Sequence, residues 1–426
     1  MSVERRAVQP SFLPRGVAAA DWRGALAWLV VVAVALVWGT AWVADSGVGL
    51  RAAPLYGRWS WHPGVGLLPA VAMGAATVVW GPTVAARLRW RWVPVATGAW
   101  AVAWAVALAA SDGWSRLTAP LTTEHEYEPL AARVDGLGGF LSGYVGHLGE
   151  YPTHVQGHPP GPVVIAWFLD HLGLGGGGWL AAVVLLAWGV AAAAALVAAG
   201  EATARRVASA VAALPAAVWA GTSMDALFAG LLAVAIAGLV VATRRDSVGW
   251  ASAGGVVGGV ALLCTYGATV VLLVGVAAVL LLAARPGRLL VTAAAGASVT
   301  LALAALAGFW WPAGLAATGE AYWDGAASAR PAVYLTLVGN PAALALATGP
   351  AVAAGFWARR VGLLPVLALG AVAIADLSQM SRGEVERIWL PFVPWLALAA
   401  PGDSRAWLAA QVGVALLLQS ILASAW

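Results

Sequence analysis

The most polar stretch of an otherwise apolar chain is TTEHEYEPLAARV, residues 122–134. Its three glutamates, Glu124, Glu126 and Glu128, alternate along the chain, so they cannot all lie on one face of a helix. A carboxylate at a membrane surface can take a proton from a hydroxyl as a general base, or it can bind a metal ion. The structural alternative is an amphipathic helix on the membrane, because the apolar residues of 127–134 recur at helical spacing.

The segment YPTHVQGHPPGPVVIAWFLD, residues 151–170, places a histidine in a constrained turn. Prolines 159–160 forbid a regular helix, so we expect His158 in an extended turn before an interfacial helix over 161–173. There the histidine could bind an anionic headgroup. The region also contains the residue types of a metal site, namely His147, Glu150, His154 and His158. Pro152 breaks the helix that would align them, which argues against a structural metal.

Two further charged positions lie at the ends of apolar segments. Asp225 is an isolated acid between two apolar helices, and such a charge near membrane depth is costly and indicates a function. Its structural alternative is to cap the following helix. The turn SRGEVER, residues 381–387, contains Glu384, Glu386 and Arg387. An arginine there could bind a lipid-linked phosphate while a glutamate holds it in position. The alternative is an interfacial anchor with surface ion pairs, which contribute little.

The composition indicates the environment of these residues. The chain has 426 residues, of which 62% are hydrophobic and 10% are charged, whereas soluble domains have about 25% charged residues. We therefore expect an all-α polytopic membrane protein, and a single membrane domain over 1–426, because no polar stretch is long enough for a soluble domain. The net charge of +4 does not indicate nucleic-acid binding, because the arginines are scattered in twos and threes.

A membrane-spanning helix needs about 20 mostly apolar residues. About thirteen segments meet this requirement: 24–45, 64–86, 93–110, 177–200, 207–223, 226–243, 249–264, 267–284, 289–310, 332–357, 361–379, 388–401 and 406–425.

Arginines predict which side each connection faces, because short cytoplasmic loops carry an excess of basic residues. Nearly all arginine-bearing connections fall on one side if the N-terminal tail 1–23 is cytoplasmic and 161–173 does not cross. The C-terminus and the loop 111–176 then lie outside a bacterial plasma membrane. This loop is far longer than any other connection, and long loops in compact proteins are usually functional.

The order and sidedness of these motifs resemble the C-type (GT-C) glycosyltransferases, the superfamily of protein O-mannosyltransferases and lipid A aminoarabinose transferases. TEHEYEPLA matches the acidic motif of their first outer loop, and GHPPGPVVIAWFL matches the proline turn that opens a short apolar helix. The family aspartate is matched by Asp225, and the late basic motif by ERIWLPFVPWL. The loop YWDGAASARPAVYLTLVGNPAAL, which contains Arg330, resembles actinobacterial members. Thr123 stands at the family's acidic-pair aspartate, and His158 stands where many members have lysine.

The resemblance implies an inverting transfer of a sugar from a polyprenyl-phosphate donor to a cell-envelope glycan, lipid or protein outside the membrane. It implies Glu124 as the general base, with Glu126 in reserve. Asp225 would support the base or, with Glu124, bind a divalent cation. The substrate-binding residues implied are Tyr127, His158, Arg330, Glu384, Glu386 and Arg387, with Arg387 and His158 binding the phosphate.

Two other functions remain open at this point. A transporter or flippase for a lipid-linked or polar substrate would place ionisable groups near the membrane midplane on broken helices. The acids of this chain fall in outer loops and at helix ends, which favours chemistry at the surface. A non-catalytic membrane scaffold with the same fold would also tolerate the threonine at position 123. In each case we expect membrane lipids as partners.

Overall fold

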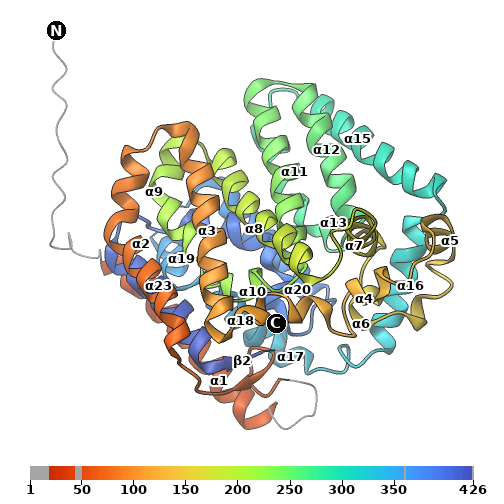
Figure 1. Cartoon of the computed structure of the whole chain (residues 1–426). Helices are drawn as coiled ribbons and strands as arrows, with labels where there is room; N and C mark the ends of the chain where they lie inside the picture. Colours follow the sequence, from red (N-terminus) through yellow and green to blue (C-terminus); the bar gives the residue numbers. More distant parts are fainter. Residues whose placement is uncertain (1–18, 44–49, 359–360, 425–426) are drawn as a thin grey trace.

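The structure, a computed structural model, describes residues 19–43, 50–358 and 361–424 (Figure 1). Most of the expected tail 1–23 lies outside these residues. The described chain is almost entirely helical, and its one sheet pairs two short antiparallel strands, β1 (Arg58–Trp59) and β2 (Leu422–Ala423). With its long apolar helices, this architecture is that of an all-α membrane protein, as the composition predicts.

Six helices of the described residues are long and apolar enough to cross a membrane. They are α1 (Ala19–Trp42), α2 (Leu68–Arg87), α3 (Val93–Ala109), α8 (Gly177–Ala199), α11 (Asp225–Arg245) and α15 (Pro286–Leu306). A bent pair passes the same test only when its two parts are taken together: α17 (Ala332–Tyr334), η7 (Leu335–Gly339) and α18 (Asn340–Thr348) meet α19 (Pro350–Trp357) at 103°, as in a broken span or a re-entrant loop. The shorter apolar helices are α12 (Val248–Leu262), α13 (Ala268–Val271), α14 (Leu273–Leu282), α20 (Leu363–Leu377) and α23 (Arg405–Ile421).

Like the bent pair within the expected span 332–357, the expected spans 207–223 and 388–401 are not continuous helices. The segment 207–223 divides into the end of α9 (Glu201–Ala212) and the short α10 (Ala217–Ala220), with Pro215 between them. The segment 388–401 is a chain of short turns: α21 (Val385–Ile388), η8 (Leu390–Phe392), α22 (Val393–Leu396) and η9 (Ala397–Ala399). Proline removes backbone donors in both segments. Both are almost entirely buried, and broken backbone is tolerated at membrane depth where protein covers it.

Helix α11 lies at the centre of the bundle and packs against α8, α12 and α14. Small residues permit these contacts: a Cβ added to Gly230 of α11 would lie 2.6 Å from the carbonyl oxygen of Ala187 in α8. Membrane helices pack through such small-residue faces because the hydrophobic effect does not distinguish lipid from protein. The packing fixes both ends of α11, one of which begins with Asp225.

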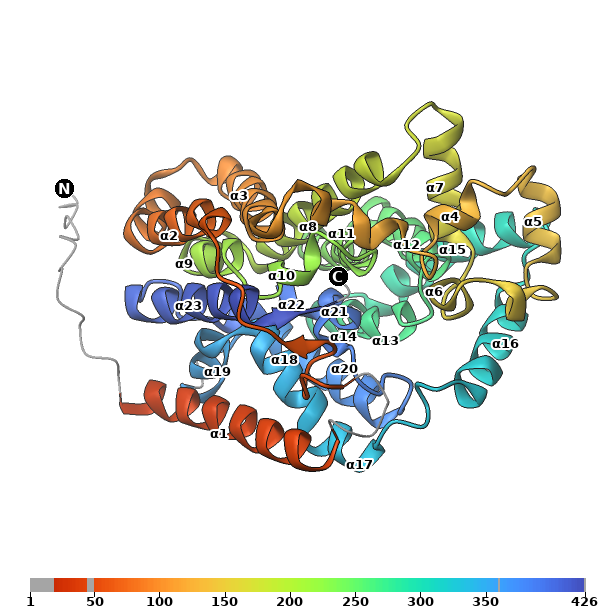
Figure 2. The same ribbon diagram turned by 60° about the horizontal axis from the view of Figure 1, so that its bottom comes forward.

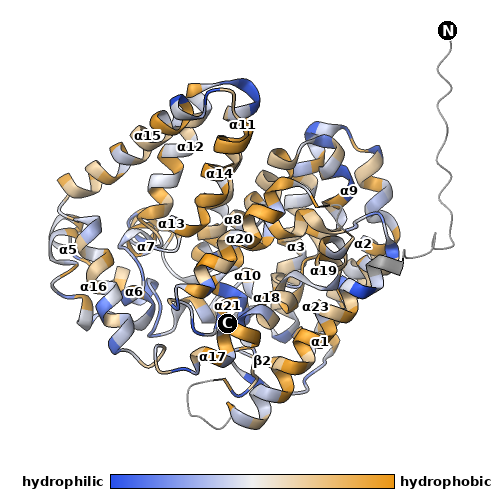
Figure 3. Ribbon diagram, turned by 180° about the vertical axis from the view of Figure 1, so that it is seen from behind, coloured by the Kyte–Doolittle hydropathy of each residue, from blue (hydrophilic) through white to orange (hydrophobic). Residues whose placement is uncertain are grey.

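The two ends of α11 differ in character. Its last residues are Arg244 and Arg245, and Arg244 donates to carbonyls at the end of α8. Asp246 then faces Arg285 and Arg288, which flank the start of α15. We call this the basic end of the bundle, and Figure 3 shows its hydrophilic turns. With 21 residues, α11 is about 30 Å long, so Asp225 lies at the opposite end.

Loop 111–176 lies at that opposite end, which we call the loop end. Its elements are η3 (Ala110–Asp112), η4 (Trp114–Leu117), η5 (Ala119–Thr122), α4 (Glu128–Ala131), α5 (Leu137–Gly143), η6 (Leu148–Glu150), α6 (Thr153–Gln156) and α7 (Gly161–His171). The later elements, from α4 to α6, lie beside α16 (Trp311–Asp324) on one side of the bundle (Figure 2), whereas η3 lies against η1 (Val65–Leu67) and α3. Helix α7 begins directly after the two prolines, as expected. The amphipathic helix expected from 127 onward is only the four-residue α4.

The segment between α1 and α2 also belongs to the loop end. It contains β1 and η1 (Val65–Leu67), and the pairing of β1 with β2 ties this segment to the end of the chain. Arg116 in η4 reaches the carbonyl of Ser424. The remaining short element, η2 (Trp90–Trp92), connects α2 to α3. Within the segment between α1 and α2, Tyr56 contacts the turn 381–387 through its backbone N–H, which donates to Glu386.

Candidate functional site

A buried arginine is the centre of a charged network at the loop end. Arg387 in α21 donates from Nη1 to Oδ2 of Asp225 at 2.7 Å and from Nη2 to Oε2 of Glu384 at 2.7 Å. Only 7% of Arg387 and 3% of Asp225 are exposed. Ion pairs so far from water require close geometry and further hydrogen bonds to persist. The contact joins residues that lie 162 positions apart.

A second branch connects Arg387 to loop 111–176 through a histidine. Nε2 of His154 in α6 lies 3.2 Å from Nη2 of Arg387, and Nδ1 lies 2.7 Å from Oε1 of Glu126. The backbone N–H of His154 donates to the carbonyl of His125, which fixes α6 against the stretch 122–128. Glu126 is buried, with 5% exposed. The carboxylate of Glu126, the imidazole of His154 and the guanidinium of Arg387 are therefore connected in series by hydrogen-bond contacts.

A third branch runs to Arg330, in the loop after α16. Its Nη2 donates to Oε1 of Glu384 at 2.7 Å, and its Nη1 donates to the carbonyl of Arg382 at 2.9 Å. The guanidinium lies 5.3 Å from the ring centroid of Tyr56, a cation–π distance. Glu384 thus bridges the two arginines of the site. Two cations and several carboxylates from five separate segments meet here.

Local hydrogen bonds hold Asp225 in place at the start of α11. The hydroxyl of Ser223 donates to Oδ2 of Asp225 at 2.6 Å, and the backbone N–H of Asp225 donates to that hydroxyl at 3.2 Å. Asp225 is the first residue of α11, and Met224 occupies the N-cap without a side-chain cap bond. The capping alternative is therefore wrong, although a helix N-terminus still favours the negative charge of Asp225.

The charges of the turn 381–387 are mutually stabilised. Burial alone would raise the pKa of Glu384, but the positive charges of Arg387 and Arg330 outweigh it and lower this pKa below its ordinary value. Burial likewise lowers the pKa of Arg387, whereas Asp225 and Glu384 raise it by a larger amount. Both side chains are therefore ionised, and the arginine stays fully charged at any physiological pH.

His158 does not face an open site. Its ring lies between Phe228, 5.2 Å away, and Tyr127, 5.8 Å away, and its Nδ1 lies 2.9 Å from the carbonyl of His154. Burial lowers the pKa of His158, so the neutral ring is the favoured form. A buried, neutral His158 does not offer the positive charge that was expected to contact a phosphate. Its ring instead contacts the backbone of α6 at His154. Tyr127 is also buried, and burial raises the pKa of its hydroxyl well above the ordinary value.

Glu386 has no access to solvent, with 0% of the residue exposed. Its Oε1 accepts the backbone N–H of Tyr56 at 2.8 Å, and within the described chain Oε2 has no hydrogen-bond partner. Burial raises the pKa of this carboxyl to about 7. The family resemblance implies that Glu386 binds substrate, but the side chain lies beneath the surface, where it holds the segment after α1 through the N–H of Tyr56.

Glu124 lies on the surface. Its side chain is 87% exposed and is 3.9 Å from the ring of its neighbour His125. Of the two glutamates considered as the base, the structure joins Glu126 to the network and leaves Glu124 in solvent. The described residues contain no group of three or more His, Cys, Asp or Glu side chains arranged to hold a metal ion. Glu124 with Asp225 does not fit a divalent cation, because Asp225 is already paired with Arg387.

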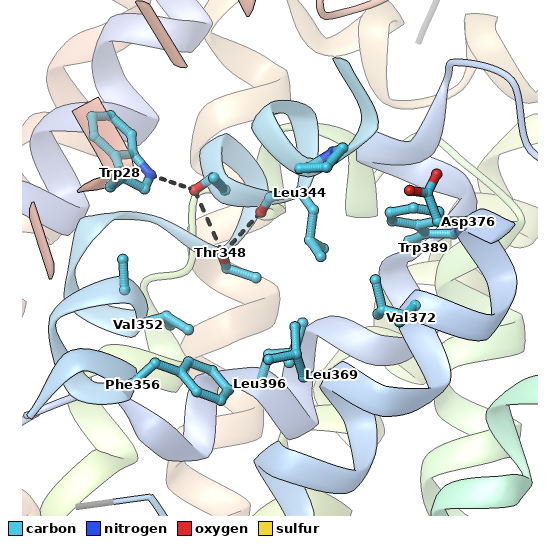
Figure 4. Close-up of a pocket in the computed structure, with 14 residues that line it drawn as sticks. Trp28, Leu344, Thr348, Val352, Phe356, Leu369, Val372, Asp376, Trp389 and Leu396 are labelled. Atoms are coloured by element: carbon cyan, nitrogen blue, oxygen red, sulfur yellow. Dashed lines mark hydrogen bonds between the residues drawn. The ribbon is translucent and has the colours of Figure 1, made fainter. Parts of the chain in front are cut away.

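An apolar cavity of about 340 Å³ lies beside the turn 381–387 (Figure 4). Residues of α1, α18, α19, α20 and α22 line it, and its few polar side chains include Thr348 and Asp376. Trp389, which follows Arg387 by two positions, forms part of its wall. Asn340 connects the cavity to the network, because its Nδ2 donates to Asp376 at 2.8 Å and its Oδ1 accepts the N–H of Gly383 at 3.2 Å.

Sequence reasoning missed two members of this arrangement. The sequence indicates His154 only as a possible ligand of a metal site, which Pro152 argues against. Its contact with Arg387 joins residues that are 233 positions apart, so no local sequence pattern predicts it. Asn340 had one available signal, since it is the only asparagine of the chain and lies in an apolar segment. A polar side chain within a membrane segment is expensive unless it is paired.

The chain was also compared with known proteins. No protein-family model matches it, and no curated protein matches its sequence. Function is therefore inferred from the chemistry of the site.

Proposed function

We propose that the protein is a membrane glycosyltransferase that moves a sugar from a polyprenyl-phosphate donor to a hydroxyl of an acceptor outside the membrane. The observation that carries the proposal is the buried chain Glu126–His154–Arg387–Asp225 beside an apolar cavity. A carboxylate able to accept a proton and a guanidinium able to hold a phosphate are joined through one imidazole, at the end of the bundle where a lipid headgroup would lie. These are the two requirements of this transfer.

The reaction needs the acceptor oxygen to attack the anomeric carbon while the bond from that carbon to the phosphate oxygen breaks. Attack on the face opposite the phosphate inverts the configuration. A guanidinium can hold a phosphate through two parallel hydrogen bonds, and stabilising charge that develops on a leaving group is a large contribution to catalysis. Arg387 and Arg330 are the candidates for this role. The cavity lined by Trp389 and the neighbouring helices offers an apolar environment for the prenyl chain.

The base belongs to the buried branch of the network. Glu126 is connected to Arg387 through His154, whereas Glu124 faces solvent. A base in a site that excludes water avoids competing hydrolysis. This choice reverses the order expected from the family resemblance, in which Glu124 comes first.

The test measures sugar transfer from a radiolabelled polyprenyl-phosphate-sugar in proteoliposomes that contain the purified protein. We expect wild-type turnover, and a loss of about 10²–10⁴-fold in Glu126→Gln, which is the usual contribution of general acid–base catalysis. Glu124→Gln is the matched control, two positions away and exposed, and it should keep the wild-type rate. Transfer that is unaffected in both variants, or lost only in Glu124→Gln, would refute the assignment of the site.

A transporter is the second candidate, and the bent pair α18–α19 favours it. The helix breaks by 103° at Gly349 beside the cavity, and secondary transporters use broken helices at their binding sites. The same proteoliposomes discriminate between the two functions. A transporter would move the labelled lipid or its sugar across the bilayer without cleaving the bond to phosphate.

A further inference from the structure

The two nitrogens of His154 face partners of opposite kind. Nδ1 lies 2.7 Å from a carboxylate oxygen of Glu126, and Nε2 lies 3.2 Å from Nη2 of Arg387. An ionised carboxylate can only accept a hydrogen bond, and a guanidinium can only donate one. The hydrogen of the imidazole must therefore be on Nδ1, and the lone pair must be on Nε2. Glu126 and Arg387 together select a single neutral tautomer.

This tautomer is the form that a general base requires. The side chain of His154 is 16% exposed and that of Glu126 is 7% exposed, so the imidazole is the more accessible of the two. Glu126 already uses one oxygen to hold the ring, and orientation of the imidazole by a buried carboxylate is also how hydrolytic triads set the histidine tautomer.

We propose that His154 is the catalytic base of the transfer and that Glu126 is a positioning residue, an inference that rests on the proposed function. The acceptor hydroxyl gives its proton to Nε2 of His154 as its oxygen bonds to the anomeric carbon. The bond from that carbon to the phosphate oxygen breaks, and its electron pair leaves with the phosphate. The imidazolium that forms donates from Nδ1 to Glu126, whose negative charge stabilises it.

The contact between His154 and Arg387 couples the base to the donor lipid. While the site is empty, Nη2 of Arg387 donates to Nε2 of His154 and occupies the lone pair. A phosphate that takes the guanidinium hydrogen bonds leaves the lone pair available to the acceptor hydroxyl. The base thus becomes competent when the leaving group is in place.

Charged and titratable groups lie on several sides of the ring. Glu126 and Arg387 contact its two nitrogens, and Asp225 and Glu384 balance Arg387 on its far side. The ring of His158 is held beneath the same short helix by the carbonyl of His154. Substitution of individual residues must therefore identify which of these groups causes the pH dependence of the transfer rate.

The experiment compares the wild type with His154→Ala in the transfer assay, with and without added imidazole, across pH 4.5–8. We expect the transfer rate of His154→Ala to be about 10²–10⁴-fold below that of the wild type. Free imidazole should raise the rate of this variant at least tenfold. The rate of the wild type should fall at low pH, because a protonated imidazole cannot accept the hydroxyl proton, and this acid limb should disappear in His154→Ala. A merely structural histidine gives neither rescue nor this change of profile.

The matched control is His125→Ala, which removes an exposed ring and should keep the rate and the profile. If His154→Ala does not fold, His154→Gln keeps a polar side chain of similar reach and should lose the same acid limb. Transfer by His154→Ala or His154→Gln at the wild-type rate, or an acid limb that persists in both variants, would overturn the inference and leave Glu126 as the base. A wild type that transfers no sugar would instead refute the proposed function itself.

Discussion

The two ends of α11 carry the same kinds of charge in opposite settings. At the loop end, Asp225 and Arg387 meet at 2.7 Å with side chains 5% and 8% exposed. At the basic end, Asp246 and Arg285 are 3.8 Å apart with side chains 44% and 67% exposed. Exposed pairs contribute about 0–1 kcal/mol to stability. Buried pairs are costly to desolvate, so the loop end requires another explanation, and we infer that this explanation is function.

Removing Arg387 should have the largest effect on stability. Arg387→Met leaves Asp225 buried without its cation, which typically costs about 3–5 kcal/mol. Thermal unfolding in detergent measures this loss, and Arg285→Met at the basic end is the matched control, with an expected change below about 0.5 kcal/mol. The double variant Arg387→Met with Asp225→Leu should recover stability, because Glu384 keeps Arg330 as its partner. Equal losses for Arg387→Met and Arg285→Met would remove the distinction between the two ends.

Glu386 should make stability depend on pH. Burial raises the pKa of this carboxyl from its ordinary 4.5 to about 7. Between these values the folded protein keeps a proton that the unfolded chain has released, so stability falls as pH rises through this window and levels off above it. One pKa unit corresponds to about 1.4 kcal/mol, which gives a total of about 3 kcal/mol.

Unfolding in detergent at a series of pH values tests this dependence. Glu386→Gln should flatten the profile of the wild type between pH 5 and pH 7. Glu201→Gln alters an exposed carboxylate paired with Arg205 and should leave the profile unchanged. A wild type that becomes more stable as pH rises through this window would contradict the buried, protonated state of Glu386.

The smallest effect is expected at the basic end. Asp246→Asn removes the negative charge near Arg285 and Arg288, at 3.8 Å and 3.7 Å. We expect a loss below about 1 kcal/mol, which salt should abolish because exposed charges are screened within about 10 Å at 0.1 M ionic strength. Measuring unfolding at low and high salt checks this. A loss comparable to that of Arg387→Met would mean that the basic end is also a structural centre.

Much of the architecture follows from local patterns in the sequence. The proline pair at 159–160 predicts where α7 begins, and the long apolar runs predict the six helices of spanning length. The segments 207–223 and 388–401 could not be distinguished from spans, because buried interior and lipid-facing helices are both apolar. Only the tertiary structure shows that both segments are buried within the protein.

The candidate site was predicted in part. The costs of burying Asp225 and Arg387 single out these residues without any knowledge of contacts, and the structure brings them together. The family resemblance ranks Glu124 before Glu126, whereas the structure leaves Glu124 exposed and joins Glu126 to the network. Burial of alternate residues in an irregular loop has no periodic signal in the sequence that could have predicted this. The place of His154 between Glu126 and Arg387 depends on tertiary contacts alone.

The long sequence separation between Asp225 and Arg387 has a consequence for biogenesis. The two residues are 162 positions apart, and synthesis proceeds at roughly 5–20 residues per second. Asp225 therefore emerges from the ribosome about 10–30 seconds before its cation exists. During that interval its carboxylate must stay hydrated or take up a proton, because the buried ion pair with Arg387 cannot yet form. The charged network at the start of α11 is thus completed only when the turn 381–387 has been translated.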